Sequence, residues 1–434
     1  MSTNSTTVDN SGGLKRESLL TRFQATRDFT EELTTSLETE DFVIQSMPDV
    51  SPAKWHLAHT SWFFEEFLLS KLKESYKPYD ELFNYLFNSY YVLAGERHCR
   101  PKRGLISRPT VREVFEYRKY INKEINDLML RMDDKQFNEI TPVIIIGINH
   151  EQQHQELMLT DIKHVFSENP LDPVYAPRPE NTNSIFSSVK MKWNEFSEGV
   201  YLIGNDGSEF GYDNEFPRHK QFVQQFSIGS RLVTNSEYIE FMEDGGYEKP
   251  ELWLSDGWNF VNTNKVNKPL YWYEKKGEWY NFTLTGCRRV GPDEPVFHVS
   301  FYEADAFARW TGTRLPTEFE WEVASLNVPR DGNFVENKNY HPLKTDESNS
   351  DKIHQMYGDV WEWTGSPYIA YPGFKPLSGA LGEYNGKFMC NQMVLRGGSC
   401  ATSKTHIRNT YRNFFPPDAR WQFMGIRLAK DGNH

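Results

Sequence analysis

Two histidines one helical turn apart are the residues of this sequence best suited to bind a metal ion. His150 and His154 lie in a segment with helical periodicity. Because each residue of an α-helix advances by ~100°, residues i and i+4 share one face, and both imidazoles can reach the same ion. The alternative is a pair of ordinary polar residues, solvated or hydrogen-bonded at the mouth of a helical bundle.

A second segment supplies candidates for a third ligand. His56 and His59 lie among tryptophan and phenylalanine residues in another segment with helical periodicity. Helices of a bundle build metal sites from facing side chains. We favour His59 because it shares an apolar face with Trp62, and His56, one turn earlier, is the alternative. A carboxylate is the competing third ligand, as in facial-triad iron sites.

Three neutral imidazoles leave positions of the ion open for other ligands. Such a site suits a redox metal that must collect two substrates and dioxygen. It also suits a zinc hydrolase in which water takes the open position. The spacing of the histidines does not choose between these metals.

The histidines must be positioned by helices. Four segments have the apolar periodicity of amphipathic helices: residues 17–38, a segment from Ser51-Pro52 to Leu68, a segment from the Thr110–Glu113 capping box onward, and a segment from Pro142 to about residue 169. Four long helices predict a four-helix bundle.

The second half of the chain has a different pattern. Prolines at positions 170, 173, 177 and 179 predict a linker. Beyond it, short apolar segments separated by Gly, Asn and Asp predict an α+β domain rich in loops, with two short helices near residues 235–242 and 302–311. We therefore expect a disordered tail over residues 1–15, a helical bundle over 16–170, a linker over 171–190 and an α+β domain over 191–434.

Composition excludes several classes of partner. The 434 residues carry Asp+Glu 60 against Lys+Arg 48, a formal net charge of −12, which should repel nucleic acid. No apolar run approaches the ~20 residues needed to cross a bilayer, and the polar start lacks the order of a secretory signal. We expect a cytoplasmic protein with no membrane and no nucleic-acid partner, and the oligomeric state stays open.

The two halves together resemble a known family. The segments WHLAH (55–59) and HEQQHQE (150–156) resemble the DinB-like domain of the nonhaem iron sulfoxide synthases of ergothioneine and ovothiol biosynthesis. The second half resembles a formylglycine-generating-enzyme (sulfatase-modifying-factor) domain, which has a C-type-lectin-like fold. Its matching motifs are PVFHVS (295–300), TRLPTEFEW (313–321), GDVWEWT (358–364), LRGGS (395–399) and GIRL (425–428).

The resemblance implies an oxidoreductase of ergothioneine biosynthesis. It would join the sulfur of cysteine to the imidazole of hercynine, which is N-α-trimethylhistidine, and oxidise that sulfur to a sulfoxide with dioxygen. Fe(II) would be the metal, held by His59, His150 and His154. The partners implied are therefore small molecules: cysteine, hercynine and dioxygen.

The resemblance also implies a catalytic tyrosine. Tyr90 and Tyr91 stand where the most similar branch of the family has a tyrosine pair. We expect one of them, Tyr91 ahead of Tyr90, to donate a proton or an electron that directs the reaction toward C–S bonding. The alternatives are that both are packing aromatics, or that Tyr368 or Tyr371 of the second domain is the donor.

Substrate contacts are expected in three segments. Arg100 and Arg103 carry planar guanidinium groups suited to the carboxylate of cysteine. By the match to the family, Asn413 and Gln153 would hydrogen-bond the hercynine carboxylate.

Aromatic residues would complete the substrate pockets. By the same match, Phe414 would pack near the hercynine carboxylate, and Tyr371 is one of the aromatic faces available to the trimethylammonium group. Family members that use γ-glutamylcysteine place an acid where this chain has Phe415. A phenyl ring cannot neutralise an ammonium group, so Phe415 favours free cysteine.

Other functions remain open at this point. Histidine in place of hercynine would make the chain an ovothiol-type 5-histidylcysteine sulfoxide synthase, which bonds sulfur to another ring carbon. A DinB-type metal-dependent thiol transferase would use zinc and need no dioxygen. A binding module without enzymatic activity is a further alternative, because lectin-like domains often only recognise ligands.

Overall fold

The computed structural model of the chain describes residues 11–72, 76–177, 189–345 and 352–432. Contacts divide the chain into a helical unit, Met1–Met158, and an α+β unit, Leu159–His434. The division falls inside the last long helix, before the boundary expected at residue 170. Most of the expected linker, residues 178–188, lies outside the described residues, as do residues 1–10 of the expected tail.

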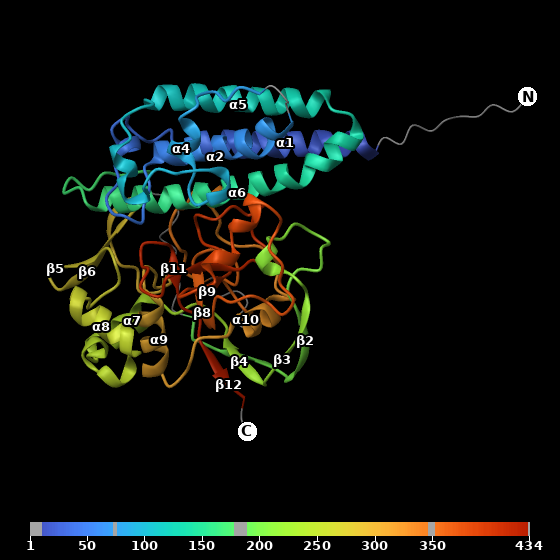
Figure 1. Ribbon diagram of the computed structural model, residues 1–434. Helices are drawn as coiled ribbons and strands as arrows, with labels where there is room; N and C mark the ends of the chain where they lie inside the picture. Colours follow the sequence, from blue (N-terminus) through green and yellow to red (C-terminus); the bar gives the residue numbers. More distant parts are fainter. Residues whose placement is uncertain (1–10, 73–75, 178–188, 346–351, 433–434) are drawn as a thin grey trace, which may run out of the picture. The chain divides into compact units, whose positions relative to one another are not determined.

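Four helices frame the helical unit, and the predicted four-helix bundle is confirmed. They are α1 (Ser11–Glu32), α2 (Ala53–Phe64), α5 (Val111–Arg131) and α6 (Asp134–Ser167), of which α6 belongs to this unit up to Met158. Figure 1 shows the axes of α1, α5 and α6 nearly parallel, with α5 running opposite to α1 and α6. A π-helical turn (Glu65–Leu69), α3 (Ser70–Leu72) and α4 (Phe83–Phe87) lie between α2 and α5 in the chain.

Capping residues set where these helices begin. At α5 the predicted capping box is present, with the Thr110 backbone N–H donating to Glu113 at 2.7 Å. The start of α6 was predicted wrongly, because the helix begins at Asp134 and Pro142 lies inside it. Asp133 and Gln136 exchange side-chain-to-backbone hydrogen bonds there, and this capping arrangement starts the helix earlier. Helix α1 begins at Ser11, inside the expected tail.

A glycine allows α2 and α6 to approach each other closely. A Cβ atom on Gly147 would lie 2.5 Å from the ring of Phe64, closer than real Cβ atoms come. Phe64 ends α2 and Gly147 lies one turn before His150 on α6. The close approach brings the histidine-bearing faces of the two helices together.

The α+β unit is built from short strands. A four-stranded sheet has the order β10-β9-β8-β11, formed by β8 (Trp361–Pro367), β9 (Met393–Arg396), β10 (Asn413–Phe415) and β11 (Met424–Gly425). A three-stranded antiparallel sheet has the order β1-β4-β12, with β1 (Trp193–Phe196), β4 (Phe226–Gly229) and β12 (Ala429–Asp431).

The described residues of this unit also form two further antiparallel sheets and four further α-helices. The sheets are β2 (Gly199–Ile203) with β3 (His219–Val223), and β5 (Trp272–Lys275) with β6 (Glu278–Thr283) and β7 (Gly286–Arg289). The helices are α7 (Asn235–Glu243), α8 (Ser255–Asn264), α9 (Phe301–Trp310) and α10 (Glu318–Ser325). The sequence predicted α7 and α9 but missed α8 and α10, although the Thr317–Glu320 capping box of α10 is a readable signal.

Buried ion pairs join the motifs that carry the family resemblance. Arg396 of LRGGS donates to Glu318 of TRLPTEFEW at 3.1 Å. Arg427 of GIRL donates to Glu362 of GDVWEWT at 2.7 Å. All four side chains are at most 1% exposed. These motifs therefore help to hold the α+β unit together.

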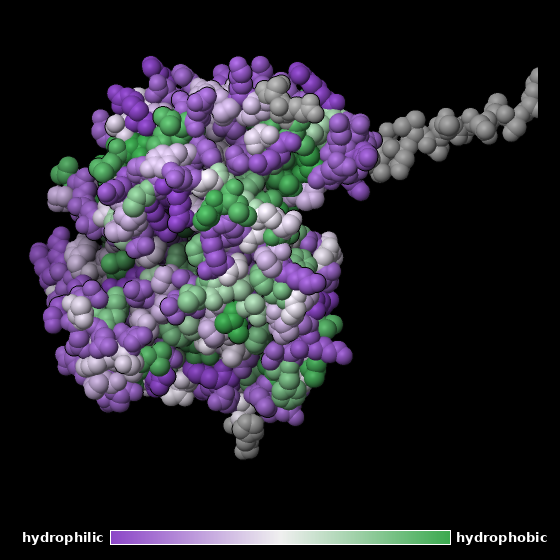
Figure 2. Space-filling view, in the orientation of Figure 1, coloured by the Kyte–Doolittle hydropathy of each residue, from purple (hydrophilic) through white to green (hydrophobic). Residues whose placement is uncertain are grey.

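Polar residues cover much of the face of each unit seen in Figure 2. No helix in the described ranges is at once long and apolar enough to cross a bilayer. Hydrophilic residues are spread over the visible face of each unit, interrupted by small hydrophobic areas (Figure 2).

Lys163 of α6 is a buried amine whose titration makes the stability depend on pH. Its Nζ lies 2.6 Å from Nε2 of His298, whose Nδ1–H donates to the carbonyl of Arg420. Burial lowers the pKa of Lys163 from 10.5 to about 7. Between these two pKa values the unfolded state binds more protons than the folded state, so the free energy of unfolding rises with pH.

Urea unfolding at the two ends of this pH window checks the effect. We expect Lys163 to contribute a rise of a few kcal/mol in the wild type, since each pKa unit corresponds to about 1.4 kcal/mol. Lys163→Met keeps an unbranched side chain of nearly the same length without the titrating amine, so the change in its free energy of unfolding across the window should be less positive than that of the wild type by that amount. An equal rise in the variant would contradict the assignment.

Candidate metal centre

Three histidines of the helical unit converge. His59 of α2 and His150 and His154 of α6 each offer one ring nitrogen, and these atoms lie within 4.8 Å of one another. The Nε2 atoms of His59 and His150 are 3.3 Å apart. Within the part of the chain that the structure describes, this three-histidine cluster is the one group of three or more His, Cys, Asp or Glu side chains able to share an ion.

The ring of His59 is fixed in a tautomer suited to metal binding. Its Nδ1 lies 2.5 Å from the carbonyl oxygen of Phe87. A carbonyl only accepts, so Nδ1 carries the proton and Nε2 keeps a lone pair toward His150. The indoles of Trp55 and Trp62 stack on the ring at 4.5 and 5.4 Å between centroids. Metal-binding histidines commonly donate their second nitrogen to a carbonyl in this way.

The three imidazoles are neutral at neutral pH. Burial lowers the pKa of His150 to about 3. Burial, reinforced by the neighbouring imidazoles, also lowers the pKa of His59 and of His154 well below 6.5. A histidine binds a metal only when it is deprotonated. The donor set, three neutral nitrogens, therefore fits a divalent transition-metal ion.

His56, the alternative ligand, takes a different position. It lies outside the three-histidine cluster, and its Nδ1 contacts Nδ1 of His154 at 2.8 Å.

Glu151, which directly follows His150, anchors α6 to the rest of the bundle. Arg27 of α1 donates to it at 2.8 Å, Arg118 of α5 donates to its other oxygen, and Thr30 donates at 2.7 Å. Burial alone would raise the pKa of Glu151, but Arg118 and Arg27 outweigh it and lower this pKa to about 2. The network holds the helix at the level of the metal ligands.

The position of Arg118 in the sequence already indicates a buried partner of opposite charge. Arg118 lies four residues after Val114 and three before Ile121, on the apolar stripe of α5. A charged residue on a buried stripe needs a partner of opposite charge.

Of the two predicted arginines, Arg103 is buried near the three-histidine cluster and Arg100 is exposed. Arg103 is buried, its guanidinium carbon lies 3.4 Å from the ring centroid of Trp55, and its Nη1 donates to Ser51 at 2.9 Å. Because Trp55 stacks on His59, Arg103 lies one ring away from the three-histidine cluster. Arg100 is exposed and donates to the backbone carbonyl of Asp49.

Of the tyrosine pair, Tyr91 lies one ring away from the cluster, and Tyr90 packs on Tyr91. Tyr91 is buried, with its ring 5.8 Å from that of Trp62, which stacks on His59. Tyr90 is half-buried and packs on Tyr91 at 4.8 Å. Gln153, also half-buried, directly precedes His154 on α6.

The remaining predicted site residues belong to the α+β unit. Asn413, Phe414 and Phe415 form β10, which pairs with β9. The ring of Phe414 stacks on Tyr368 at 4.1 Å, and the side-chain oxygen of Asn413 accepts the backbone N–H of Phe414. Phe415 packs edge-on against Trp421 at 5.8 Å.

Tyr371 makes buried hydrogen bonds within the α+β unit, and its contact with substrate stays a prediction. It is 3% exposed, its hydroxyl donates to Glu318 at 3.2 Å, and it accepts from Arg396 at 3.1 Å. Both hydrogen bonds belong to the buried ion-pair network of this unit. The sequence could not reveal this, because the partners lie 53 and 25 residues away.

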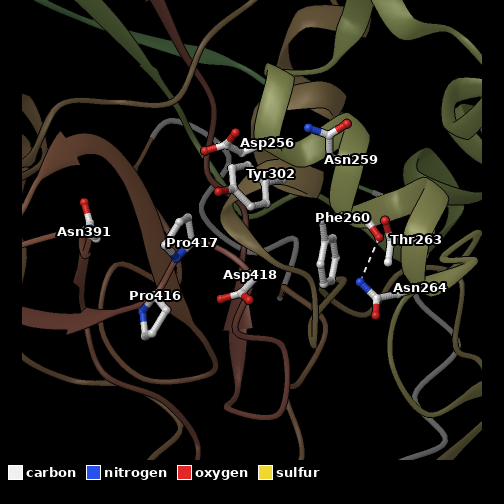
Figure 3. A pocket seen from close by; sticks show the side chains of 10 residues that line it. All are labelled: Asp256, Asn259, Phe260, Thr263, Asn264, Tyr302, Asn391, Pro416, Pro417 and Asp418. Atoms are coloured by element: carbon white, nitrogen blue, oxygen red, sulfur yellow. Dashed lines mark hydrogen bonds between the residues drawn. The ribbon is translucent and has the colours of Figure 1, made fainter.

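A separate pocket of about 500 Å³ lies in the α+β unit (Figure 3). The rings of Phe260 and Tyr302 and the carboxylates of Asp256 and Asp418 line it. Burial and these two carboxylates raise the pKa of Tyr302. None of the predicted site residues lines this pocket. Pro416, which does line it, directly follows Phe415.

Known proteins resemble both units. Residues 22–158 match the DinB superfamily, and residues 196–432 match the sulfatase-modifying factor enzyme 1-like domain. A hercynine oxygenase of Mycobacterium tuberculosis is 32% identical over 316 residues, covering 67% of this chain and 71% of the relative. Ergothioneine biosynthesis protein 1 of Schizosaccharomyces pombe is 27% identical over 51% of this chain and 28% of its own length. The formylglycine-generating enzyme of Bos taurus is 24% identical over 54% of this chain and 73% of its own length.

Proposed function

Because this chain of a DinB unit and a sulfatase-modifying-factor-like unit belongs to the hercynine oxygenase family, we propose that it is an iron(II)- and dioxygen-dependent sulfoxide synthase of ergothioneine biosynthesis. Its substrates are cysteine, hercynine and dioxygen, and its product is hercynylcysteine sulfoxide. The single observation that carries the proposal is the cluster of His59, His150 and His154 in a chain of this family.

The proposed reaction balances with dioxygen as the only oxidant. The S–H bond of cysteine and one C–H bond of the imidazole break, and a C–S bond forms. One oxygen atom becomes the sulfoxide oxygen and the other leaves as water with the two hydrogens. Dioxygen takes up four electrons, two from C–S bond formation and two from oxidation of the sulfur.

The metal and the residues around it have separate roles in this proposal. Iron(II) held by the three imidazoles would lower the pKa of a thiol bound to it and would bring the reactants together at its open coordination positions. The Phe87 carbonyl keeps His59 in the required tautomer. Arg103 supplies the positive charge for the cysteine carboxylate, and Tyr91 supplies a proton from its phenol. The contacts of Tyr90, Arg100, Gln153, Asn413, Phe414 and Phe415 with substrate stay predictions.

Removal of the Tyr91 hydroxyl should change the product. In Tyr91→Phe the ring still packs against Trp62 while the proton donor is lost. General acid–base groups contribute about 10²–10⁴-fold, so sulfoxide formation should fall by at least about 100-fold and cysteine sulfinate should become the main product. Mass spectrometry of both products checks this. An unchanged product ratio would show that Tyr91 is not the donor, and Tyr90→Phe would then be tested.

The choice of substrates is tested by pairing each thiol with each imidazole. Cysteine and γ-glutamylcysteine are each incubated with hercynine and with histidine, first without and then with dioxygen. We expect sulfoxide only from cysteine with hercynine and only in air. Product from histidine would indicate the ovothiol-type reaction, and a thioether formed without dioxygen would indicate a zinc-type thiol transferase.

A further inference from the structure

A fourth buried imidazole contacts the three-histidine cluster. The side chain of His56 is 3% exposed, and its Nδ1 lies 2.8 Å from the Nδ1 of His154. His56 is one helical turn before His59 on α2, so α2 presents two imidazoles toward α6. Only the later one belongs to the cluster whose nitrogens lie within 4.8 Å of one another.

The contact between the two Nδ1 atoms restricts the tautomer of His154. One of the two nitrogens must donate and the other must accept. If Nδ1 of His154 accepted, its proton would sit on Nε2, and the ring would have no lone pair left for a metal. His154 therefore binds a metal only as the tautomer whose Nδ1–H donates to His56.

We infer that His56 is a positioning residue that accepts the Nδ1–H of His154 and so holds its Nε2 toward the metal. The inference rests on the proposed function, because it assumes that the three-histidine cluster binds a metal. His56 does for His154 what the Phe87 carbonyl does for His59. Loss of such a partner typically weakens metal binding by about 10–100-fold.

Three substitutions separate the acceptor role from simple packing. His56→Asn places an amide oxygen close to the position of Nδ1 and so keeps the acceptor. His56→Gln carries the same amide one methylene farther out, and His56→Leu has no acceptor. The matched control is His164→Leu, which removes a half-buried imidazole from the same helix as His154 but outside the cluster.

The experiment is an anaerobic titration of the metal-free, full-length proteins with Fe(II). We expect His56→Leu and His56→Gln to bind iron about 10–100-fold more weakly than the wild type, and His56→Asn and His164→Leu to stay close to it. Thermal unfolding of each metal-free protein verifies that it is folded. If His56→Leu does not fold, the comparison of Asn with Gln still decides.

Three results would overturn the inference. The first is wild-type iron affinity in His56→Gln and His56→Leu, and the second is equal weakening in His56→Asn. The third is an X-ray absorption spectrum of the iron-loaded wild type that requires four imidazoles, since His56 would then be a ligand. An iron-loaded wild type that forms no sulfoxide would refute the proposed function but not this inference, because iron affinity is measured without turnover.

Discussion

Substitution of His150 by alanine is expected to abolish iron binding and sulfoxide formation together. His150 is one of the three proposed ligands, and its Nε2 lies 3.3 Å from the Nε2 of His59. Its ring is neutral because burial lowers its pKa to about 3. Loss of a partner outside the coordination sphere already costs about 10–100-fold in affinity, so loss of a ligand should exceed about 100-fold. Anaerobic iron titration and product mass spectrometry measure the two effects.

The control for this experiment is His164→Ala. His164 lies on the same helix, so its substitution tests whether loss of any α6 imidazole disturbs the protein. We expect iron affinity and product yield to stay at the wild-type level. Stoichiometric iron in His150→Ala would show that the three-histidine cluster is not the metal site.

Substitution of Glu151 by alanine is expected to destabilise the fold more than any other single change discussed. It leaves the buried guanidinium of Arg27 without a carboxylate and leaves that of Arg118 with only Glu31. Removal of one partner of a buried ion pair costs about 3–5 kcal/mol. Urea unfolding of the metal-free protein should show a loss of that size.

A surface ion pair of the same unit provides the comparison. Glu116 and Arg112 are one turn apart on α5, 3.8 Å from each other, and their side chains are 59% and 83% exposed. Exposed pairs of this kind contribute about 0.3–0.5 kcal/mol. Glu116→Ala should therefore stay within that range, and an equally small effect of Glu151→Ala would contradict the structural role of the network.

Local signals in the sequence predicted the part of the site that follows from helical spacing. His150 and His154 share a face because of their i, i+4 spacing, and the capping box at Thr110 begins α5 where expected. Pairing His59 with them required only that apolar stripes of two helices face each other. These features depend on neighbours in the chain, which is why a single sequence contains them.

Features that depend on distant residues were not predictable in this way. Glu151 meets Arg27 across 124 residues, and Tyr371 meets Glu318 across 53. Local spacing says nothing about such pairs, so the hydrogen bond of Tyr371 to Glu318 and the ion pairs of Glu151 were not predicted. A charged side chain on an apolar stripe is the one local sign that such a partner exists.

The most direct test of the proposed function is a reaction of the iron-loaded protein with cysteine, hercynine and dioxygen enriched in oxygen-18. We expect hercynylcysteine sulfoxide with one heavy oxygen atom on sulfur in the wild type, and none of this product in His150→Ala. A product whose sulfoxide oxygen comes from water, or a C–S bond formed without dioxygen, would contradict iron-dependent oxidative sulfur transfer at the three-histidine cluster.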